Sequence, residues 1–178
     1  LFAALERWGP AAAAPAPVKS AAPKPAAPKP PPGHEVVVGY GRVGSLVGAG
    51  LAKAGRRVVV IEEGADAIAA AAADGAEVVT GNAADPAVLA GAEIAGAARI
   101  FVTIPEPFEA GQVVEQARAV NAAVPILARA HSEAAVVHLE GLGATLTVMG
   151  ERETAHGIME RATGRGDAGW RSRPRWRC

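Results

Sequence analysis

The stretch Glu35-Val-Val-Val-Gly39-Tyr-Gly41-Arg-Val-Gly44-Ser-Leu-Val47 decides the fold of this 178-residue chain. It opens as an apolar run of three valines and then places three glycines in the spacing G-x-G-x-x-G. Beyond the glycines, apolar residues recur at helical spacing, namely Val43, Leu46, Val47, Leu51 and Ala54. This pattern predicts a buried strand, a tight turn and a helix packed on the sheet.

Each glycine of the turn has a separate physical task in a nucleotide-binding unit. Gly39 permits the turn, Gly41 lets the backbone approach a pyrophosphate, and Gly44 allows close contact between helix and strand. The free N–H groups of the first helical turn then face the phosphates. We expect Tyr40 to face out of the turn and to pack rather than stack on a base. The candidate binding residues here are Gly39, Tyr40, Gly41, Arg42, Val43 and Gly44.

The glycine spacing alone is weak evidence for a nucleotide site, because the chain contains 21 glycines. A second observation strengthens it. The next apolar run, residues 57–61, ends in Glu62, which lies 18 residues after Gly44. A carboxylate at the end of the second strand accepts hydrogen bonds from ribose hydroxyls. We therefore predict a nucleotide-binding βαβ unit, with Glu62 as the ribose ligand and Glu63 as a second candidate.

The rest of the chain alternates between strand and helix patterns as far as residue 162. Strands are expected at 36–38, 57–61, 77–80, 99–104, 125–131 and 144–149, with helices between them and a last helix at 151–162. Asp66, Asp85 and Ser132 are predicted to cap three of the helices. Six strands alternating with helices predict a Rossmann-like α/β fold, a doubly wound parallel sheet of order 3-2-1-4-5-6 with its ligand crevice beside the first strand.

Composition divides the chain into four parts. Residues 1–9 read as the remnant of a preceding helix, and the alternatives are an arbitrary boundary or the cytoplasmic end of a membrane helix. Residues 10–33 form a Pro/Ala-rich linker, expected to be disordered and extended, with a reach of roughly 70 Å at ~3.1 Å per residue. Residues 34–163 form the nucleotide-binding domain, and residues 164–178 a disordered basic tail.

Charge and cysteine content exclude several classes of function. Between His34 and Glu160 there are 16 Asp and Glu against eight Lys and Arg, so the globular part is acidic and unsuited to nucleic acid. No apolar run reaches about 18 residues, so no segment is expected to span a membrane. The single cysteine, Cys178, permits no disulfide within the chain and fits a reducing cytoplasm. His138 and His156 lack partners at metal-ligand spacing, and no metal site is predicted.

Further blocks of sequence extend the comparison to a known family. In addition to the glycine turn and Val59-Val-Ile-Glu62, the chain contains Gly81-Asn-Ala-Ala84, Thr103-Ile-Pro105, Glu109-Ala-Gly111, Ala128-Arg-Ala-His131 and Val148-Met-Gly-Glu-Arg-Glu153. In this order they resemble the RCK N-terminal (TrkA-N) domain, and within it the cytoplasmic domain of Kef- and YbaL-type monovalent cation:proton antiporters. The resemblance covers residues 34–162, while the tail beyond Ala162 departs from the family pattern.

The resemblance implies a regulatory domain of a potassium or monovalent cation/proton antiporter. Such a domain binds an adenine nucleotide, NAD(H) or AMP/ADP/ATP, forms a homodimer, and gates a transmembrane antiporter domain of the same full-length chain at the cytoplasmic face of the bacterial inner membrane. The resemblance also implies that Asn82 and Ala83 lie near the adenine and that Ile104 lies at the floor of the crevice. Arg42 and Arg129 then lie near the phosphates or near a second, inter-subunit ligand.

Other interpretations of the same residues stay open at this point. Asn82 fits an Asx-turn, and Arg42 fits a surface salt bridge. The whole chain also fits a small NAD-dependent oxidoreductase or a dimerisation module with a non-functional pocket. An enzyme is not expected, because only one helix and an arginine-rich tail follow the sheet, with no second domain to supply a substrate pocket.

Overall fold

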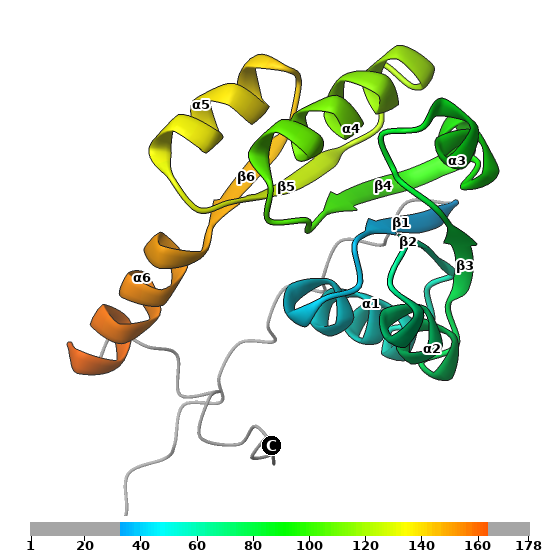
Figure 1. Ribbon diagram of the computed structural model, residues 1–178. Helices are drawn as coiled ribbons and strands as arrows, with labels where there is room; N and C mark the ends of the chain where they lie inside the picture. The colour runs from blue at the N-terminus through cyan, green and yellow to red at the C-terminus, as the bar shows by residue number, and fades with distance from the viewer. Residues whose placement is uncertain (1–32, 164–178) are drawn as a thin grey trace, which may run out of the picture. The chain divides into compact units, whose positions relative to one another are not determined.

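The computed structural model describes residues 33–163, which form a six-stranded parallel sheet with helices on both faces (Figure 1). The strand order β3-β2-β1-β4-β5-β6 confirms the predicted fold and order. The elements are β1 (His34–Val38), α1 (Arg42–Lys53), β2 (Val58–Glu62), α2 (Ala65–Ala73), β3 (Glu77–Thr80), α3 (Pro86–Gly91), η1 (Ile94–Gly96), β4 (Ala97–Val102), α4 (Pro107–Val120), β5 (Ile126–Ala130), α5 (Glu133–Gly141), β6 (Leu146–Met149) and α6 (Gly150–Ala162). The expectations for residues 1–9, 10–32 and 164–178 lie outside the described residues.

Helices lie on both faces of the sheet. Helices α1 and α2 lie on one face, over a small core that contains Val37, Val58 and Val60. Helices α3, α4 and α5 lie on the other face, over a larger core that includes Ile100, Ile126 and Leu139 (Figure 1). Most side chains in both cores are small and aliphatic, as the low aromatic content of 4% predicts, with Tyr40 as a buried aromatic residue under α1.

The predicted caps are confirmed at two helices and wrong at a third. The Asp85 side chain accepts a hydrogen bond from the N–H of Ala87, and Ser132 accepts one from Ala135. Helix α2 instead begins after Gly64 without a side-chain cap, and Asp66 lies inside its first turn. The reason is that the helix begins at Ala65, whereas a cap at Asp66 requires a helix that begins one residue after it.

Two apolar residues of the helices are exposed instead of packing on the sheet. Leu46 is 65% exposed on α1, and Val120 is 55% exposed at the end of α4. Their helical spacing is correct, but each lies at the margin of an apolar stripe. The spacing of apolar residues predicts which side of a helix packs on the sheet. It predicts less well how many residues on that side the sheet covers.

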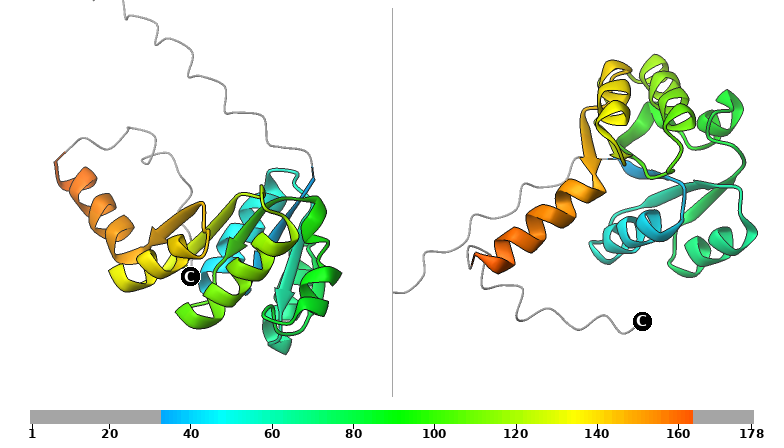
Figure 2. Two further views of the ribbon diagram at one scale, coloured as in Figure 1. Left: turned by 90° about the horizontal axis from the view of Figure 1, so that it is seen from above. Right: turned by 60° about the vertical axis from the view of Figure 1, so that its left-hand side comes forward.

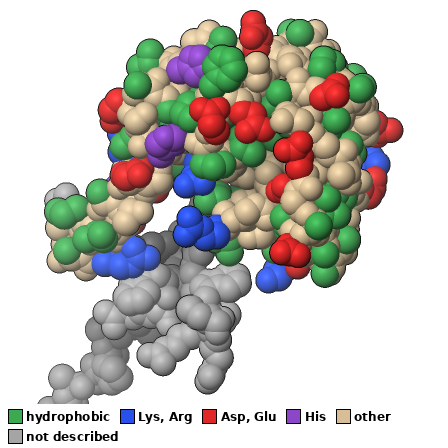
Figure 3. All heavy atoms as spheres, in the orientation of Figure 1, with side chains coloured by type: hydrophobic (Ala, Val, Ile, Leu, Met, Phe, Trp, Pro, Cys, Tyr) green, Lys and Arg blue, Asp and Glu red, His purple; other side chains and the backbone are tan. Residues whose placement is uncertain are grey.

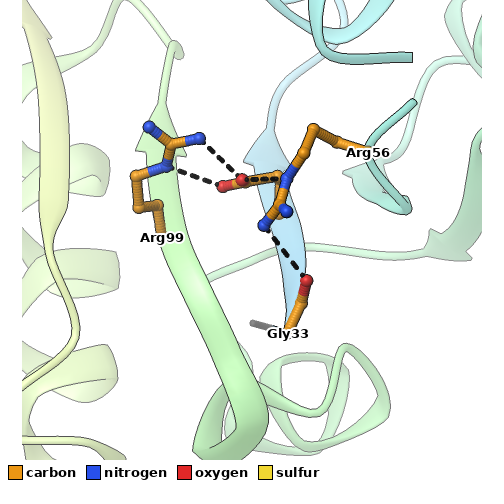
Figure 4. Close-up of polar contacts among 4 residues, drawn as sticks. Gly33, Arg56 and Arg99 are labelled. Carbon is orange, nitrogen blue, oxygen red and sulfur yellow. Dashed lines mark hydrogen bonds and ion pairs between the residues drawn. The ribbon is translucent and has the colours of Figure 1, made fainter. Parts of the chain in front are cut away.

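Strand β1 is buried along its whole length, including a charged residue. Glu35 is 0% exposed, and its carboxylate accepts hydrogen bonds from Arg56 Nε at 2.8 Å and from Arg99 Nε and Nη2 at 3.0 and 2.7 Å. Figure 4 shows the two guanidinium groups approaching this carboxylate from opposite sides. Burial raises the pKa of Glu35, but the hydrogen bonds from Arg99 and Arg56 outweigh burial and hold this pKa below its ordinary value.

Helix α6 leaves the sheet instead of packing back onto it. It follows β6 directly, since β6 ends at Met149 and α6 begins at Gly150. Figure 2 shows it extending away from the remaining helices, and none of its residues is buried. The large apolar side chains of α6 are therefore exposed, with Ile158 60% and Met159 57% accessible.

Replacing Glu35 with glutamine should destabilise the fold strongly. Glu35→Gln leaves two arginines close to a buried neutral amide, and breaking such a pair costs about 3 kcal/mol or more in the free energy of unfolding. Because its folded pKa is lowered, Glu35 stabilises the fold above its unfolded pKa, and this contribution is lost as pH falls through the folded pKa. Urea unfolding between pH 7 and pH 3, followed by circular dichroism, measures both effects.

The exposed pair between Arg57 and Glu77, 2.7 Å apart, supplies the matched control. Glu77→Gln neutralises a carboxylate that lies in solvent, so it should cost much less stability than Glu35→Gln. Equal losses in the free energy of unfolding for Glu35→Gln and Glu77→Gln would contradict the prediction that the buried pair contributes more.

Candidate functional site

A narrow hollow lies where the carboxyl ends of β1, β2 and β4 meet, at the point where the strand order reverses. This is the place where open α/β sheets bind ligands. It measures about 40 Å³ and combines backbone, apolar groups and carboxylates. Its lining residues are Val38, Gly39, Ile61, Glu62, Glu63, Gly81, Asn82, Ala83, Ile104 and Glu109.

The glycine turn between β1 and α1 is held by close contacts. Gly39 has φ +83°, and a Cβ on it would lie 2.8 Å from Ile104 Cγ2. A Cβ on Gly44 would collide with the carbonyl of Gly39 and lie 2.7 Å from Thr103 Oγ1. The Thr103 hydroxyl in turn donates to the carbonyl oxygens of Val38 and Gly39, at 3.0 and 2.9 Å. These two glycines therefore serve the turn and its packing.

Gly41 differs from the other two glycines of the motif. It is exposed, its φ of −72° suits any residue, and a Cβ built on it meets nothing within 4 Å. It is also the N-cap of α1, which has neither a side-chain cap nor an acidic residue in its first turn. The first N–H groups of this helix, and the positive end of its dipole, are thus left without a side-chain acceptor.

Glu62 connects two turns at the mouth of the hollow. Its Oε2 accepts a hydrogen bond from Tyr40 N at 2.6 Å, and its Oε1 accepts from Glu63 N at 2.8 Å and Gly64 N at 3.0 Å. Burial raises the pKa of Glu62, but these three backbone hydrogen bonds more than offset it, and the pKa lies below its ordinary value. The side chain is only partly buried, so a charged acceptor faces the hollow in a fixed orientation.

The loop after β3 supplies the opposite wall of the hollow. Asn82 Oδ1 accepts a hydrogen bond from Ala84 N at 2.7 Å, so the Asx-turn interpretation is confirmed. Ala83 is 5% exposed, while Asn82 itself is exposed at the rim. Ile104, from the segment after β4, lies against the glycine turn and lines the same hollow. The wall is therefore mainly apolar with polar groups at the edge.

The expectation that Tyr40 faces out of the turn is wrong. Its side chain is 3% exposed and packs under α1, against the position where Gly48 lacks a side chain. The hydroxyl donates to Asp74 Oδ2 at 2.8 Å, and burial together with this contact raises the pKa of Tyr40 to about 12. The Tyr40 side chain thus connects α1 to the end of α2. Only the backbone of Tyr40 faces the site.

Two of the predicted site residues border a different hollow. Val43 and Arg129 line an apolar hollow of about 270 Å³ beside the carboxyl ends of β4, β5 and β6. Arg42 is exposed at the start of α1, on the glycine turn. The structure thus brings Gly39, Glu62, Glu63, Asn82, Ala83 and Ile104 into one site. Gly41 and Arg42 lie on the adjoining turn, whereas Val43 and Arg129 line the other hollow.

Glu109 is a site residue that the sequence patterns did not predict. Its side chain lines the hollow, and burial together with the charges of Glu63, Glu106 and Glu62 raises its pKa. The signal available in the sequence was the block Glu109-Ala-Gly111, in which Glu109 lies in the first turn of α4, the helix that follows the fourth strand. Three carboxylates, those of Glu62, Glu63 and Glu109, therefore face one end of the site.

Within residues 33–163, no group of three or more His, Cys, Asp or Glu side chains could hold a metal ion. A search of the same residues for a membrane-spanning helix finds none that combines the length with the apolar character required.

The sheet order, the glycine turn and the acidic end of β2 define a Rossmann-like domain. Within this class, the model of the TrkA-N domain family matches residues 36–150. The chain belongs to the TrkA-N family, as the sequence blocks predict.

The chain is also similar to individual proteins. It is 40% identical over 127 residues to the putative cation/proton antiporter YbaL of Escherichia coli, covering 71% of this chain but 23% of that protein. The crystal structure of the TrkA-N domain of YbaL is also 40% identical, covers 72% of this chain and 96% of that chain, and has a TM-score of 0.69. The Kef C-terminal domain of Shewanella denitrificans in its AMP-bound form shares the fold at 24% identity and a TM-score of 0.62, covering 76% and 82%.

Alanine substitution at Gly41 should separate ligand binding from folding. The added methyl group meets no protein atom, so stability should change by less than about 1 kcal/mol. The same methyl group occupies the space in which a phosphate approaches the backbone, so nucleotide affinity should fall by at least roughly tenfold. Isothermal titration calorimetry and thermal unfolding of the same samples measure the two quantities.

Gly50→Ala is the matched control for this experiment. A Cβ on Gly50 also meets nothing within 4 Å, and the residue lies on the same helix. This variant should bind as the unaltered chain does. Undiminished nucleotide binding by Gly41→Ala would show that the phosphates lie elsewhere.

Proposed function

We propose that residues 33–163 bind an adenine nucleotide at the hollow beside β1. The observation that carries this proposal is the placement of two complementary groups at one crevice. The uncapped start of α1 presents N–H donors, while Glu62 presents a charged acceptor held by three backbone N–H groups. A nucleotide needs this combination, because its phosphates accept hydrogen bonds and its ribose hydroxyls donate them.

The size and charge of the site suggest how the ligand lies. A hollow of about 40 Å³ can hold only part of a nucleotide, so the adenine edge and ribose enter it and the phosphates lie over the open space at Gly41. Glu62, Glu63 and Glu109 make the ribose end acidic, and this repels a 2′-phosphate. The site therefore favours NAD(H) or AMP, ADP and ATP over NADP(H).

The proposed role is regulation of ion transport by a domain at the cytoplasmic face of the bacterial inner membrane. Membership of the TrkA-N family supports it, together with 40% identity to a putative cation/proton antiporter of which this chain spans about a quarter. The proposed partners are a second copy of this chain and the transmembrane antiporter domain of the same full-length chain. A nucleotide regulates such a transporter if it binds one of two conformations more tightly than the other.

Ligand binding rather than catalysis is the proposed use of the crevice. The titratable side chains that line it are the carboxylates of Glu62, Glu63 and Glu109. Glu62 is engaged by backbone groups that stabilise its charged form, which suits a permanent hydrogen-bond acceptor better than a group that exchanges protons.

Thermal unfolding with separate nucleotides tests the proposal. NADH, NAD, ATP, ADP or AMP, whichever is the ligand, should add about 2.7 kcal/mol to the free energy of unfolding at 100 times its dissociation constant, whereas NADP should have a smaller effect. Glu62→Gln should lower the ligand-induced increment, because an amide cannot replace a carboxylate that accepts from both the protein and the ribose.

Glu62→Gln also removes acceptors from backbone N–H groups, so the variant should be less stable without ligand. The relevant quantity is therefore the increment produced by the ligand, compared with that of Glu115→Gln, an exposed residue on α4. The absence of an increment with every nucleotide would overturn the proposed function.

A further inference from the structure

One carboxylate at the candidate site lacks a stabilising partner among the described residues. Glu109 lies in the first turn of α4 and lines the hollow beside β1. Its side chain is partly buried, and within residues 33–163 no hydrogen bond or ion pair engages its carboxylate. A carboxylate that loses water without gaining a donor or a cation is poorly solvated in its charged form. Glu109 is therefore a group that gains from protonation.

The charged groups that face Glu109 within residues 33–163 are all carboxylates. Glu63 and Glu62 face it from the end of β2, and Glu106 faces it from the start of its own helix. Burial raises the pKa of Glu109 most, and these three negative charges raise it further. The walls that come from β1, from the loop after β3 and from the segment after β4 carry no charged side chain. Figure 3 shows acidic side chains spread over the surface around α4, while basic side chains gather near α1 and α6.

The neighbouring carboxylates are better stabilised as anions than Glu109 is. Glu62 accepts hydrogen bonds from three backbone N–H groups. Glu106 is the N-cap of α4, and its Oε2 accepts from the N–H of Glu109 at 2.6 Å, so its charge lies at the positive end of the helix dipole. Glu63 is exposed, and water solvates its charge. When repulsion within the group is relieved by one proton, Glu109 is the member that loses least by accepting it.

A nucleotide in the proposed position increases both effects on Glu109. Its adenine edge and ribose cover the hollow and displace water, and its phosphates bring negative charge to the adjoining turn at Gly41. A charged carboxylate can only accept hydrogen bonds, whereas a protonated carboxyl group can also donate one. The protonated form can therefore meet an acceptor on the ligand, such as a ring nitrogen of the base or an oxygen of the ribose.

We propose that Glu109 takes up a proton from solvent when a nucleotide binds, so that the site responds to nucleotide and to pH together. The proton adds to a carboxylate oxygen of Glu109, and no bond of the nucleotide breaks. This inference rests on the proposed function for the position of the nucleotide, and it names a regulation of that same site.

The direction of the pH effect follows from linkage. The pKa of Glu109 in the free domain is above its ordinary value, and in the complex it is higher still. Affinity is therefore greatest below the pKa of the free site and falls as pH rises through the pKa of the complex. In the interval between the two, uptake of a full proton corresponds to about tenfold in the dissociation constant per pH unit. The domain thus binds its ligand more tightly as the proton concentration rises.

Isothermal titration calorimetry of the full 178-residue chain tests this coupling. The probes are NAD and ADP, titrated separately between pH 5 and pH 8 in buffers of different ionisation enthalpy. The dependence of the binding enthalpy on the buffer gives the number of protons taken up. The unaltered chain should take up a measurable fraction of a proton, and its affinity should fall with rising pH. The terminal phosphate of ADP titrates near pH 6 itself, so its contribution is removed by comparison with the variants.

Glu109→Gln imitates the protonated carboxyl group and should separate this role from a structural one. The variant should show no proton uptake and a flat pH profile. At pH 8 it should bind at least as tightly as the unaltered chain, because it no longer places a charge beside the ligand. A side chain that only supports the structure would instead lower the affinity at every pH when it is replaced, and the slope would remain.

Glu115→Gln is the matched control, since Glu115 is an exposed glutamate on the same helix. It should bind and take up protons as the unaltered chain does. Glu63→Gln should retain proton uptake, and its loss there but not in Glu109→Gln would overturn the assignment to Glu109. Nucleotide binding without proton uptake, or an unchanged pH slope in Glu109→Gln, would overturn the inference alone. A chain that binds neither probe would overturn the proposed function as well.

Discussion

The burial of β1 between β2 and β4 is the constraint on which the rest of the domain depends. Every side chain of this strand is at most 4% exposed, so each polar group on it must find a partner within the fold. Glu35 meets this requirement through Arg56 and Arg99, which join the loop before β2 to β4 across the central strand. Strand β1 ends at Val38 and α1 begins at Arg42, and the candidate site is built on the tight turn between them.

The site is assembled mainly from backbone groups, and side chains set their positions. Glu62 connects the turn after β1 to the turn after β2, and Thr103 connects the turn after β1 to the end of β4. Tyr40, buried beneath α1, fixes that helix against α2 through Asp74. The N–H groups at the start of α1 are thus held in place before any ligand arrives, which lowers the entropic cost of binding.

The sequence was sufficient for the fold because the relevant signals are local and repeated. Valine runs, glycine turns and the caps at Asp85 and Ser132 each specify an element within a few residues, and their alternation specifies the sheet order. The inward direction of Tyr40 and the exposure of Leu46 depend on where α1 lies over the sheet and how much of its surface the sheet covers. No local sequence pattern encodes this placement. The contribution of Glu109 to the site and the separation of Arg129 from it are likewise consequences of three-dimensional packing.

The position of Gly33 has a mechanical consequence. Arg56 donates to the carbonyl oxygen of Gly33 at 3.3 Å while it holds Glu35, so the chain enters the sheet at its centre and is anchored at once. Tension applied at Gly33 along the direction of β1 acts parallel to the neighbouring strands. The hydrogen bonds to β2 and β4 then share the load in shear instead of opening one after another. Such tension therefore acts on β1 as a whole, and β1 leads directly into the glycine turn.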